Sequence, residues 1–221
     1  MKDTNPLRIL IVDDHAIVRE GVRQILSSAF QADFREAGDA RVALEVARRN
    51  PLDLILLDVT MPGRSGLDIL GELQAAQPNT PILVLSTHGE DQFARRVLRA
   101  GGSGYITKAS VPNELIRAAR KVLTGGRYVS ESLAEQLAGV LQRGNSPSGA
   151  AHESLSAREF EVLRMIALGK SGKEIAAELC VSFKTISTYR TRLLQKLDLR
   201  TNAELVQYAL REGLIEGRGG L

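Results

Sequence analysis

The chain has 221 residues, of which 43% are hydrophobic, and it carries a formal net charge of +3 at pH 7. This length allows one or two domains with real cores, and no apolar stretch approaches the roughly 18 residues of a membrane span. A single cysteine excludes an internal disulfide, and the N-terminal sequence lacks the charged-then-apolar pattern of a signal peptide. We therefore expect a cytoplasmic protein, whose net charge is too small to indicate nucleic-acid binding by itself.

Two apolar runs in the first half of the chain end in acidic residues. Asp13 and Asp14 follow the run 7–12, and Asp58 follows the run 52–57. Both runs are typical of buried parallel strands, so the three carboxylates are expected at the edge of the sheet where open α/β folds bind ligands. Clustered carboxylates raise one another's pKa unless a cation lies between them, and oxygen ligands suit Mg²⁺. The sequence therefore predicts a magnesium site formed by these three residues.

Two further polar side chains are expected at the same edge. Ser86 follows the apolar run 82–85, and Lys108 follows the short stretch 104–107. A hydroxyl, an ammonium and a metal-bound carboxylate cluster together suit in-line phosphoryl transfer onto a carboxylate. We expect Asp58 to be the nucleophile, with Lys108 neutralising charge and Ser86 hydrogen-bonding a phosphoryl oxygen.

The order and spacing of these motifs resemble those of response-regulator receiver domains over roughly residues 5–125. The matching segments are Asp13-Asp14, Asp58-Val59-Thr60-Met61-Pro62-Gly63, Ser86 and Gly104-Tyr105-Ile106-Thr107-Lys108. Ala109 stands where many receivers have proline, and Ser86 stands where threonine is common. The resemblance implies phosphorylation of Asp58 by a sensor histidine kinase, with Ser86, Lys108, Thr60 and Tyr105 as catalytic or switch residues. Tyr105 would be the aromatic side chain that changes rotamer.

Strands and amphipathic helical stripes alternate over this region, which predicts a doubly wound, five-stranded parallel sheet of the flavodoxin type with five helices. A further helix is expected over 131–141, followed by a linker rich in Gly, Pro, Ser and Ala over 142–151. We expect a receiver domain over 1–127, a helix and flexible linker over 128–152, and a second domain over 153–221.

The second domain has a wholly helical pattern. Ser156 and Ser171 each open a capping box, Ser182 caps a third helix that runs to about residue 197, and a fourth helix is expected over 202–211. The short second helix, tight turn and longer third helix predict a helix-turn-helix whose third helix enters the DNA major groove. From residue 180 to residue 200 there are five basic residues and one acidic residue, which is the charge pattern of a DNA-binding surface.

This domain resembles the LuxR-type DNA-binding domain over roughly residues 153–216. The matching segments are residues 155–163, 169–176 and 184–189, within which Tyr189 stands where the family commonly has histidine. Together with a receiver, this organisation is similar to the NarL/FixJ family of transcriptional response regulators. The resemblance implies a homodimer when phosphorylated. It implies a sensor histidine kinase and double-stranded DNA as partners, with RNA polymerase as a further candidate.

The third helix of this domain has two distinct faces. Ile186, Leu193 and Leu197 recur at helical spacing and should pack inward. The candidate DNA-binding residues are Lys184, Thr185, Ser187, Thr188, Arg190, Thr191, Arg192 and Lys196. By resemblance, the hydroxyls of residues 187, 188 and 191 would contact base edges, and the cations of residues 184, 190 and 196 would hold phosphates. The fourth helix carries more apolar surface than one core-facing stripe requires, which predicts a dimer contact.

Two other functional classes are considered beside the regulator. In a DNA binder that is constitutive or controlled by a ligand, the receiver would be a relic, but every predicted phosphorylation residue is present. A phosphatase or hydrolase using Asp58 covalently would resemble haloacid dehalogenases, which need a second acid where this chain has Thr60. We therefore expect no enzyme beyond a receiver that promotes its own phosphorylation and dephosphorylation. His15 is expected to be a partly exposed loop residue, and Cys180 a small core residue.

Overall fold

The chain forms two compact units, Met1–Asn145 and Ser146–Leu221, in a computed structural model. The structure describes residues 5–61, 64, 66–87, 90–110, 112–130, 134–135 and 151–215. Within these ranges no helix has the length and apolar character needed to cross a membrane.

Five parallel strands form the sheet of the first unit, in the order β2-β1-β3-β4-β5, as the sequence predicts. The strands are β1 (Leu7–Val12), β2 (Ala32–Ala37), β3 (Leu54–Asp58), β4 (Ile82–Ser86) and β5 (Gly104–Thr107). Every residue of β3 and β4 is buried, because helices cover both faces of the sheet at its centre. This explains why these strands appear in the sequence as continuous apolar runs rather than as alternating patterns.

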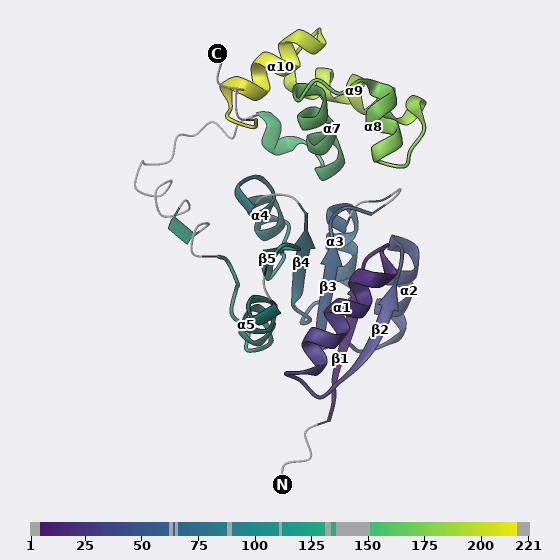
Figure 1. Ribbon diagram of the computed structural model, residues 1–221, viewed down its shortest axis with the longest axis vertical. Helices are drawn as coiled ribbons and strands as arrows, with labels where there is room; N and C mark the ends of the chain where they lie inside the picture. The colour runs from purple at the N-terminus through teal and green to yellow at the C-terminus, as the bar shows by residue number, and fades with distance from the viewer. Residues whose placement is uncertain are drawn as a thin grey trace. The chain divides into compact units, whose positions relative to one another are not determined.

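Five helices accompany the sheet (Figure 1): α1 (Ala16–Ser27), α2 (Ala40–Arg49), α3 (Gly66–Ala76), α4 (Glu90–Arg99) and α5 (Pro112–Leu123). On one face of the sheet, Ile11 and Leu56 belong to a core shared with Leu26 of α1 and Leu115 of α5. The alternate strand residues, such as Leu57, are equally buried, so the opposite face is covered as well. The expected doubly wound fold is confirmed.

The chain returns to the edge of the sheet after α5. Tyr128 donates its backbone N–H to the carbonyl oxygen of Ser103 at 2.9 Å and forms a parallel bridge with Gly104. A Cβ atom on Gly104 would lie 2.8 Å from the carbonyl oxygen of Tyr128, so this close approach requires glycine. Of the helix expected over 131–141, only Ala134 and Glu135 are among the described residues, and both are helical. Of the expected linker over 142–151, residues 142–150 lie outside the described residues, and Ala151 begins a short 3₁₀ helix.

The second unit contains the four predicted helices, preceded by a short 3₁₀ helix. They are η1 (Ala151–Ser154), α7 (Ala157–Ala167), α8 (Gly172–Glu178), α9 (Phe183–Leu197) and α10 (Asn202–Arg211). Both predicted capping boxes are present: Ser156 and Glu159 form the first, and Ser171 and Glu174 the second. The side chain of Ser182 accepts a hydrogen bond from the backbone N–H of Thr185 and so begins α9, as expected.

The turn between α8 and α9 is fixed by backbone conformation and by a buried arginine. Cys180 adopts a left-handed conformation with φ +50° and is exposed, so the prediction of a small core residue was wrong. The chain reverses at this residue, which turns its side chain outward. Arg158 is 2% exposed, pairs with Glu161 at 2.6 Å and donates a hydrogen bond to the carbonyl oxygen of Leu179. Arg158 therefore ties α7 to the end of α8.

Candidate functional site

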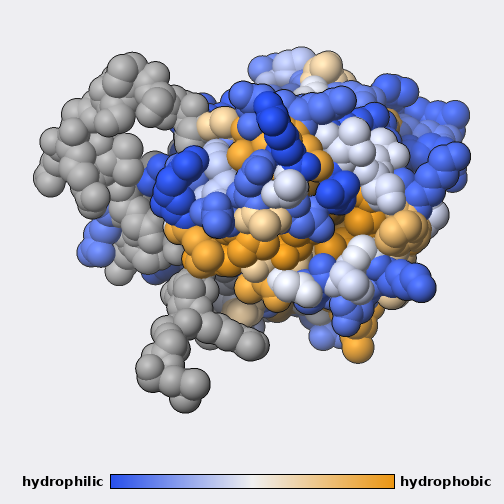
Figure 2. Space-filling view, turned by 90° about the horizontal axis from the view of Figure 1, so that it is seen from above, coloured by the Kyte–Doolittle hydropathy of each residue, from blue (hydrophilic) through white to orange (hydrophobic). Residues whose placement is uncertain are grey.

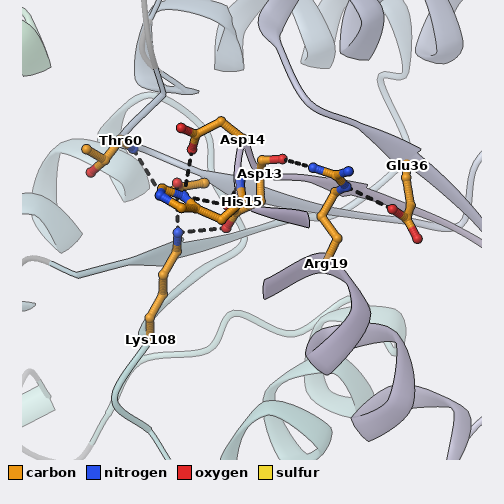
Figure 3. Close-up of polar contacts among 8 residues, drawn as sticks. Asp13, Asp14, His15, Arg19, Glu36, Thr60 and Lys108 are labelled. Atoms are coloured by element: carbon orange, nitrogen blue, oxygen red, sulfur yellow. Dashed lines mark hydrogen bonds and ion pairs between the residues drawn. The ribbon is translucent and has the colours of Figure 1, made fainter. Parts of the chain in front are cut away.

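The carboxyl edge of the sheet brings together the first group of predicted site residues. Asp13 follows β1 and Asp58 ends β3, and the two strands are hydrogen-bonded neighbours in which Val12 pairs with Leu57. Lys108 follows β5 and extends toward both acids (Figure 3). The strand ends therefore place residues 13, 58 and 108 at one point, as the sequence predicts.

Lys108 bridges the two buried carboxylates. Its Nζ lies 2.6 Å from Oδ2 of Asp13 and 2.7 Å from Oδ2 of Asp58. Asp13 and Asp58 are each 1% exposed, whereas the lysine side chain is 15% exposed. The backbone N–H of Lys108 also donates to the carbonyl oxygen of Ser86 at 2.6 Å, which fixes the lysine loop with Ala109 in place of proline.

Burial and charge act against each other at this site. Burial raises the pKa of the Asp58 carboxyl to about 6, although hydrogen bonds from Lys108 and from the backbone N–H of Thr60 favour its ionised form. Burial alone would lower the pKa of Lys108, but its hydrogen bonds to Asp13 and Asp58 carry that pKa above its ordinary value. Lys108 is therefore a cation at neutral pH, and Asp58 is a carboxylate whose ionised state is held at a cost.

Asp14 and His15 complete the acidic cluster on the side away from Lys108. Nδ1 of His15 lies 3.0 Å from Oδ1 of Asp14 and 3.4 Å from Oδ1 of Asp13, and its side chain is 63% exposed. One ligand atom from each of these three residues lies within 4.8 Å of the other two. His15 is exposed, as expected of a loop residue, and the structure adds its contact with both acids. Lys108 pairs with Asp13 and Asp58 but not with Asp14, so the cluster retains negative charge that a hard divalent cation would offset.

The remaining predicted switch residues are Thr60, Ser86 and Tyr105. The backbone N–H of Thr60 donates to Oδ1 of Asp58 at 3.0 Å, while the Thr60 hydroxyl is buried with no hydrogen-bond partner in the described part of the chain. Ser86 ends β4 and is 0% exposed, and Tyr105 in β5 is also 0% exposed. Thr60 therefore contacts the Asp58 carboxylate through its backbone N–H.

Two residues near this site were not singled out in the sequence. Arg19 of α1 donates to the carbonyl oxygen of Asp13 at 2.7 Å and to Glu36 at 2.8 Å, and so holds the acidic loop against β2 (Figure 3). Gly66 begins α3, where an added Cβ would lie 2.0 Å from the carbonyl oxygen of Asp58. The only sequence signal for Gly66 is a glycine at the start of an apolar helical stripe. The sequence carries no signal for the contacts of Arg19.

The second group of predicted residues lies on α9. Ile186, Leu193 and Leu197 are buried, as predicted, and the opposite side of the helix is largely exposed. The predicted DNA-contacting residues that are exposed are Lys184, Ser187, Thr188, Thr191, Arg192 and Lys196, and those that are partly exposed are Thr185 and Arg190. The hydroxyls of residues 187, 188 and 191 donate to backbone carbonyl oxygens four residues earlier. Their lone pairs and the threonine methyl groups therefore remain for contacts outside the helix.

The basic residues of α9 differ in how far they are already paired. Lys196 lies 2.7 Å from Oε2 of Glu159, and this contact contributes to the lowered pKa of that glutamate against the effect of burial. Arg190 donates from Nε to Asn202 at 2.6 Å. Within the described residues, Lys184 and Arg192 form no ion pair. Lys196 thus links α9 to α7, whereas Lys184 and Arg192 are available for anions.

The last helix, α10, has a buried face and a second apolar face. Leu205, Tyr208 and Ala209 are buried, and the hydroxyl of Tyr208 lies 3.0 Å from Nδ1 of His152 in η1. Val206 is partly exposed and Leu210 is 45% exposed, one turn apart on the helix. Figure 2 shows a face on which hydrophilic residues predominate and hydrophobic surface is visible between them.

Known families match both parts of the chain. Residues 9–120 match the model of the response regulator receiver domain, and residues 153–209 match that of bacterial regulatory proteins of the luxR family. The chain is 36% identical to the response regulator GacA of Pseudomonas aeruginosa, over 95% of this chain and 98% of that protein. It is 34% identical to the response regulator UvrY of Escherichia coli K12, over 94% and 95% respectively. RcsB of Salmonella enterica serovar Typhimurium, bound to promoter P1flhDC with the phosphomimetic BeF3−, matches at TM-score 0.57 and 26% identity, over 92% and 98%.

Proposed function

The chain belongs to the response regulators that join a receiver domain to a LuxR-type DNA-binding domain, and from this we propose that Asp58 accepts the phosphoryl group that controls DNA binding through α9. The protein is a two-component transcriptional regulator with a histidine kinase and DNA as its partners. The observation that carries the proposal is the buried Asp58 carboxylate, bridged to Asp13 by Lys108. Binding of a DNA duplex measured before and after loading with a small phosphodonor tests it, and equal affinity in both states would contradict it.

The geometry supports transfer of a phosphoryl group from a kinase histidine to Asp58. An oxygen of Asp58 attacks phosphorus as the bond to the imidazole nitrogen breaks, and the imidazole leaves with the electron pair. Lys108 neutralises the negative charge that arrives, and the hydroxyl of Ser86 donates a hydrogen bond to a phosphoryl oxygen. A phosphorylated aspartate carries nearly two negative charges beside Asp13, so this lysine contact gains importance after transfer.

The donor set of the acidic cluster fits Mg²⁺, and we assign the ion to Asp13, Asp14 and Asp58. Bound there, the ion would offset charge between the carboxylates and the transferring group. Asp14 is the better position at which to test metal binding, because replacing Asp13 would also remove its ion pair with Lys108. Lys108 holds the carboxylates of Asp13 and Asp58 in place.

Replacing Asp14 with asparagine should weaken Mg²⁺ binding by about tenfold or more, because it removes ligand charge without removing shape. Isothermal titration with MgCl₂ measures the effect. Asp33→Asn is the matched control, since Asp33 is an exposed carboxylate near the opposite end of the neighbouring strand β2. Equal Mg²⁺ affinity in the Asp14 variant and the wild type would remove Asp14 from the ligand set.

On α9 we assign Lys184 to phosphate and Thr188 to a base edge. Lys184→Ala should weaken binding to all duplexes and lower the slope of log affinity against log salt by about one. Thr188→Ala should change preference between duplexes by about 1–3 kcal/mol and leave the slope unchanged. Titrations of a selected operator and a scrambled duplex at several salt concentrations measure both quantities. If Lys184→Ala affected only the operator, the two assignments would have to be exchanged or dropped.

We assign the exposed apolar face of α10 to contact with a second copy of the chain, which would match two DNA half-sites by symmetry. Leu210→Glu should lower the affinity of cooperative DNA binding by about tenfold, because a buried leucine contributes roughly 1.5–3 kcal/mol. Gel-shift titration on a two-half-site duplex measures it. Leu168→Glu is the control, because Leu168 is also exposed but ends α7. Loss of cooperativity in the control alone would place the dimer contact elsewhere.

A further inference from the structure

Phe183 is a large aromatic residue exposed at the start of α9. It is the first residue of this helix and is 56% exposed. Single exposed apolar residues are ordinary on protein surfaces, and Leu168 at the end of α7 is 59% exposed. The position of Phe183 distinguishes it, because the N-terminal residues of a recognition helix contact base edges in a helix-turn-helix complex.

One edge of the Phe183 ring lies close to the first residue of α8. A Cβ atom added to Gly172, the first residue of α8, would lie 2.8 Å from Cε2 of the ring. The edge of the ring therefore rests on the glycine backbone, and any larger residue at position 172 would displace it.

Phe183 shares its helix face with the hydroxyl residues assigned to base contacts. Ser187 and Thr191 follow at intervals of four residues, and such residues lie above one another on a helix. The hydroxyl of Ser187 donates to the carbonyl oxygen of Phe183 at 3.1 Å, and that of Thr191 donates to the carbonyl oxygen of Ser187 at 3.0 Å. The ring thus extends the proposed base-contacting stripe by one turn toward the helix N-terminus.

We propose that Phe183 contacts the C5-methyl group of a thymine and makes thymine the preferred base at one position of each half-site. This inference rests on the proposed DNA-contacting role of α9. The ring has no hydrogen-bond donor or acceptor, and thymine methyl is the apolar group that base pairs present in the major groove. Phosphate is not a partner for the ring, because the aromatic face carries partial negative charge.

The test replaces each thymine of a selected operator duplex, one at a time, by deoxyuridine, which removes only the methyl group. The full-length wild-type protein should lose about threefold to fivefold in affinity at one thymine per half-site, as expected for one lost methyl contact. Phe183→Ala should bind the thymine and uracil duplexes equally at that position. Leu168→Ala is the matched control and should discriminate as the wild type does. Thermal unfolding shows whether each variant is folded.

The outcomes separate this inference from the assignment on which it rests. Wild-type protein that prefers the operator over a scrambled duplex but tolerates every uracil would overturn the methyl contact alone. The same holds if Phe183→Ala keeps the wild-type discrimination. Wild-type protein with no preference for the operator would overturn the base-contacting role of α9 and the Phe183 contact with it. Phe183→Leu adds a further arm, because a smaller apolar side chain should restore part of the discrimination.

Discussion

Asp58→Asn is expected to abolish labelling of the protein by a small phosphodonor in the presence of Mg²⁺. Asparagine keeps the shape of the side chain but provides no carboxylate oxygen to attack phosphorus. Phosphoprotein gels or intact-mass measurement give the readout. Asp53→Asn is the matched control: Asp53 lies before the opposite end of β3 and pairs with Arg8 at 2.8 Å, so its replacement should leave labelling unchanged. Equal labelling of the Asp58 variant and the wild type would show that another residue accepts the phosphoryl group.

Asp58→Asn also tests whether ionisation of the Asp58 carboxyl destabilises the folded protein. The pKa of Asp58 is about 6 in the folded protein, above the ordinary aspartate value of 3.8. A raised pKa in the folded state means that ionisation of this group opposes folding, and its opposition grows as pH rises from about 4 to about 6. Without metal at pH 7, Asp58→Asn should therefore unfold at a temperature at least as high as the wild type. A lower unfolding temperature would mean that the bridge to Lys108 outweighs the burial of the carboxylate.

Gly66→Ala is expected to abolish or severely reduce phosphorylation although residue 66 carries no reactive group. The added Cβ would lie 2.0 Å from the backbone carbonyl oxygen of Asp58, so the end of β3 or the start of α3 must move. Overpacking of this kind typically lowers the free energy of unfolding by about 1–3 kcal/mol. A shift of the Asp58 backbone would also separate its carboxylate from Lys108. Labelling rate and thermal unfolding measure the two consequences.

Gly71→Ala provides the control within the same helix. Gly71 is exposed in α3, and a Cβ there would meet no atom within 4 Å. Alanine in an exposed helix interior is favoured over glycine by about 1 kcal/mol, so this variant should gain stability and keep full labelling. If both variants lost labelling equally, the cause would be α3 as a whole rather than the contact between Gly66 and Asp58.

The fold could be predicted from the sequence because its signals are local or periodic. The continuous apolar runs predict β3 and β4 as fully buried strands, and serine caps at Ser156, Ser171 and Ser182 give the starts of three helices to within a residue. The meeting of Asp13 with Asp58 also follows from the sequence, since both end parallel strands. These inferences need only the residue periodicity of helices and strands and the parallel direction of the strands in the sheet.

The finer contacts could not be predicted, because they join residues that are distant in the chain. The ion pair of Lys196 with Glu159 spans 37 residues, and without it the lysine resembles any other exposed cation on the helix. The hydrogen bond of Arg190 to Asn202 is of the same kind. Cys180 was misjudged because its apolar neighbours suggested a buried helix end, whereas a left-handed turn places it outside. In each case the sequence gives the residue type but not the tertiary contact or backbone conformation.

The docking of Tyr128 on β5 bears on how the first unit can be prepared as an isolated fragment. β5 is an outer strand of the sheet, and the backbone of Tyr128 pairs with Ser103 and Gly104 there. A fragment ending at residue 127 would leave this row of backbone groups unpaired and uncover apolar surface, which are the properties that promote self-association of strands between molecules. Ending the fragment at residue 130 keeps the protecting segment. The stretch after α5 therefore covers the outer edge of β5 and belongs with the sheet.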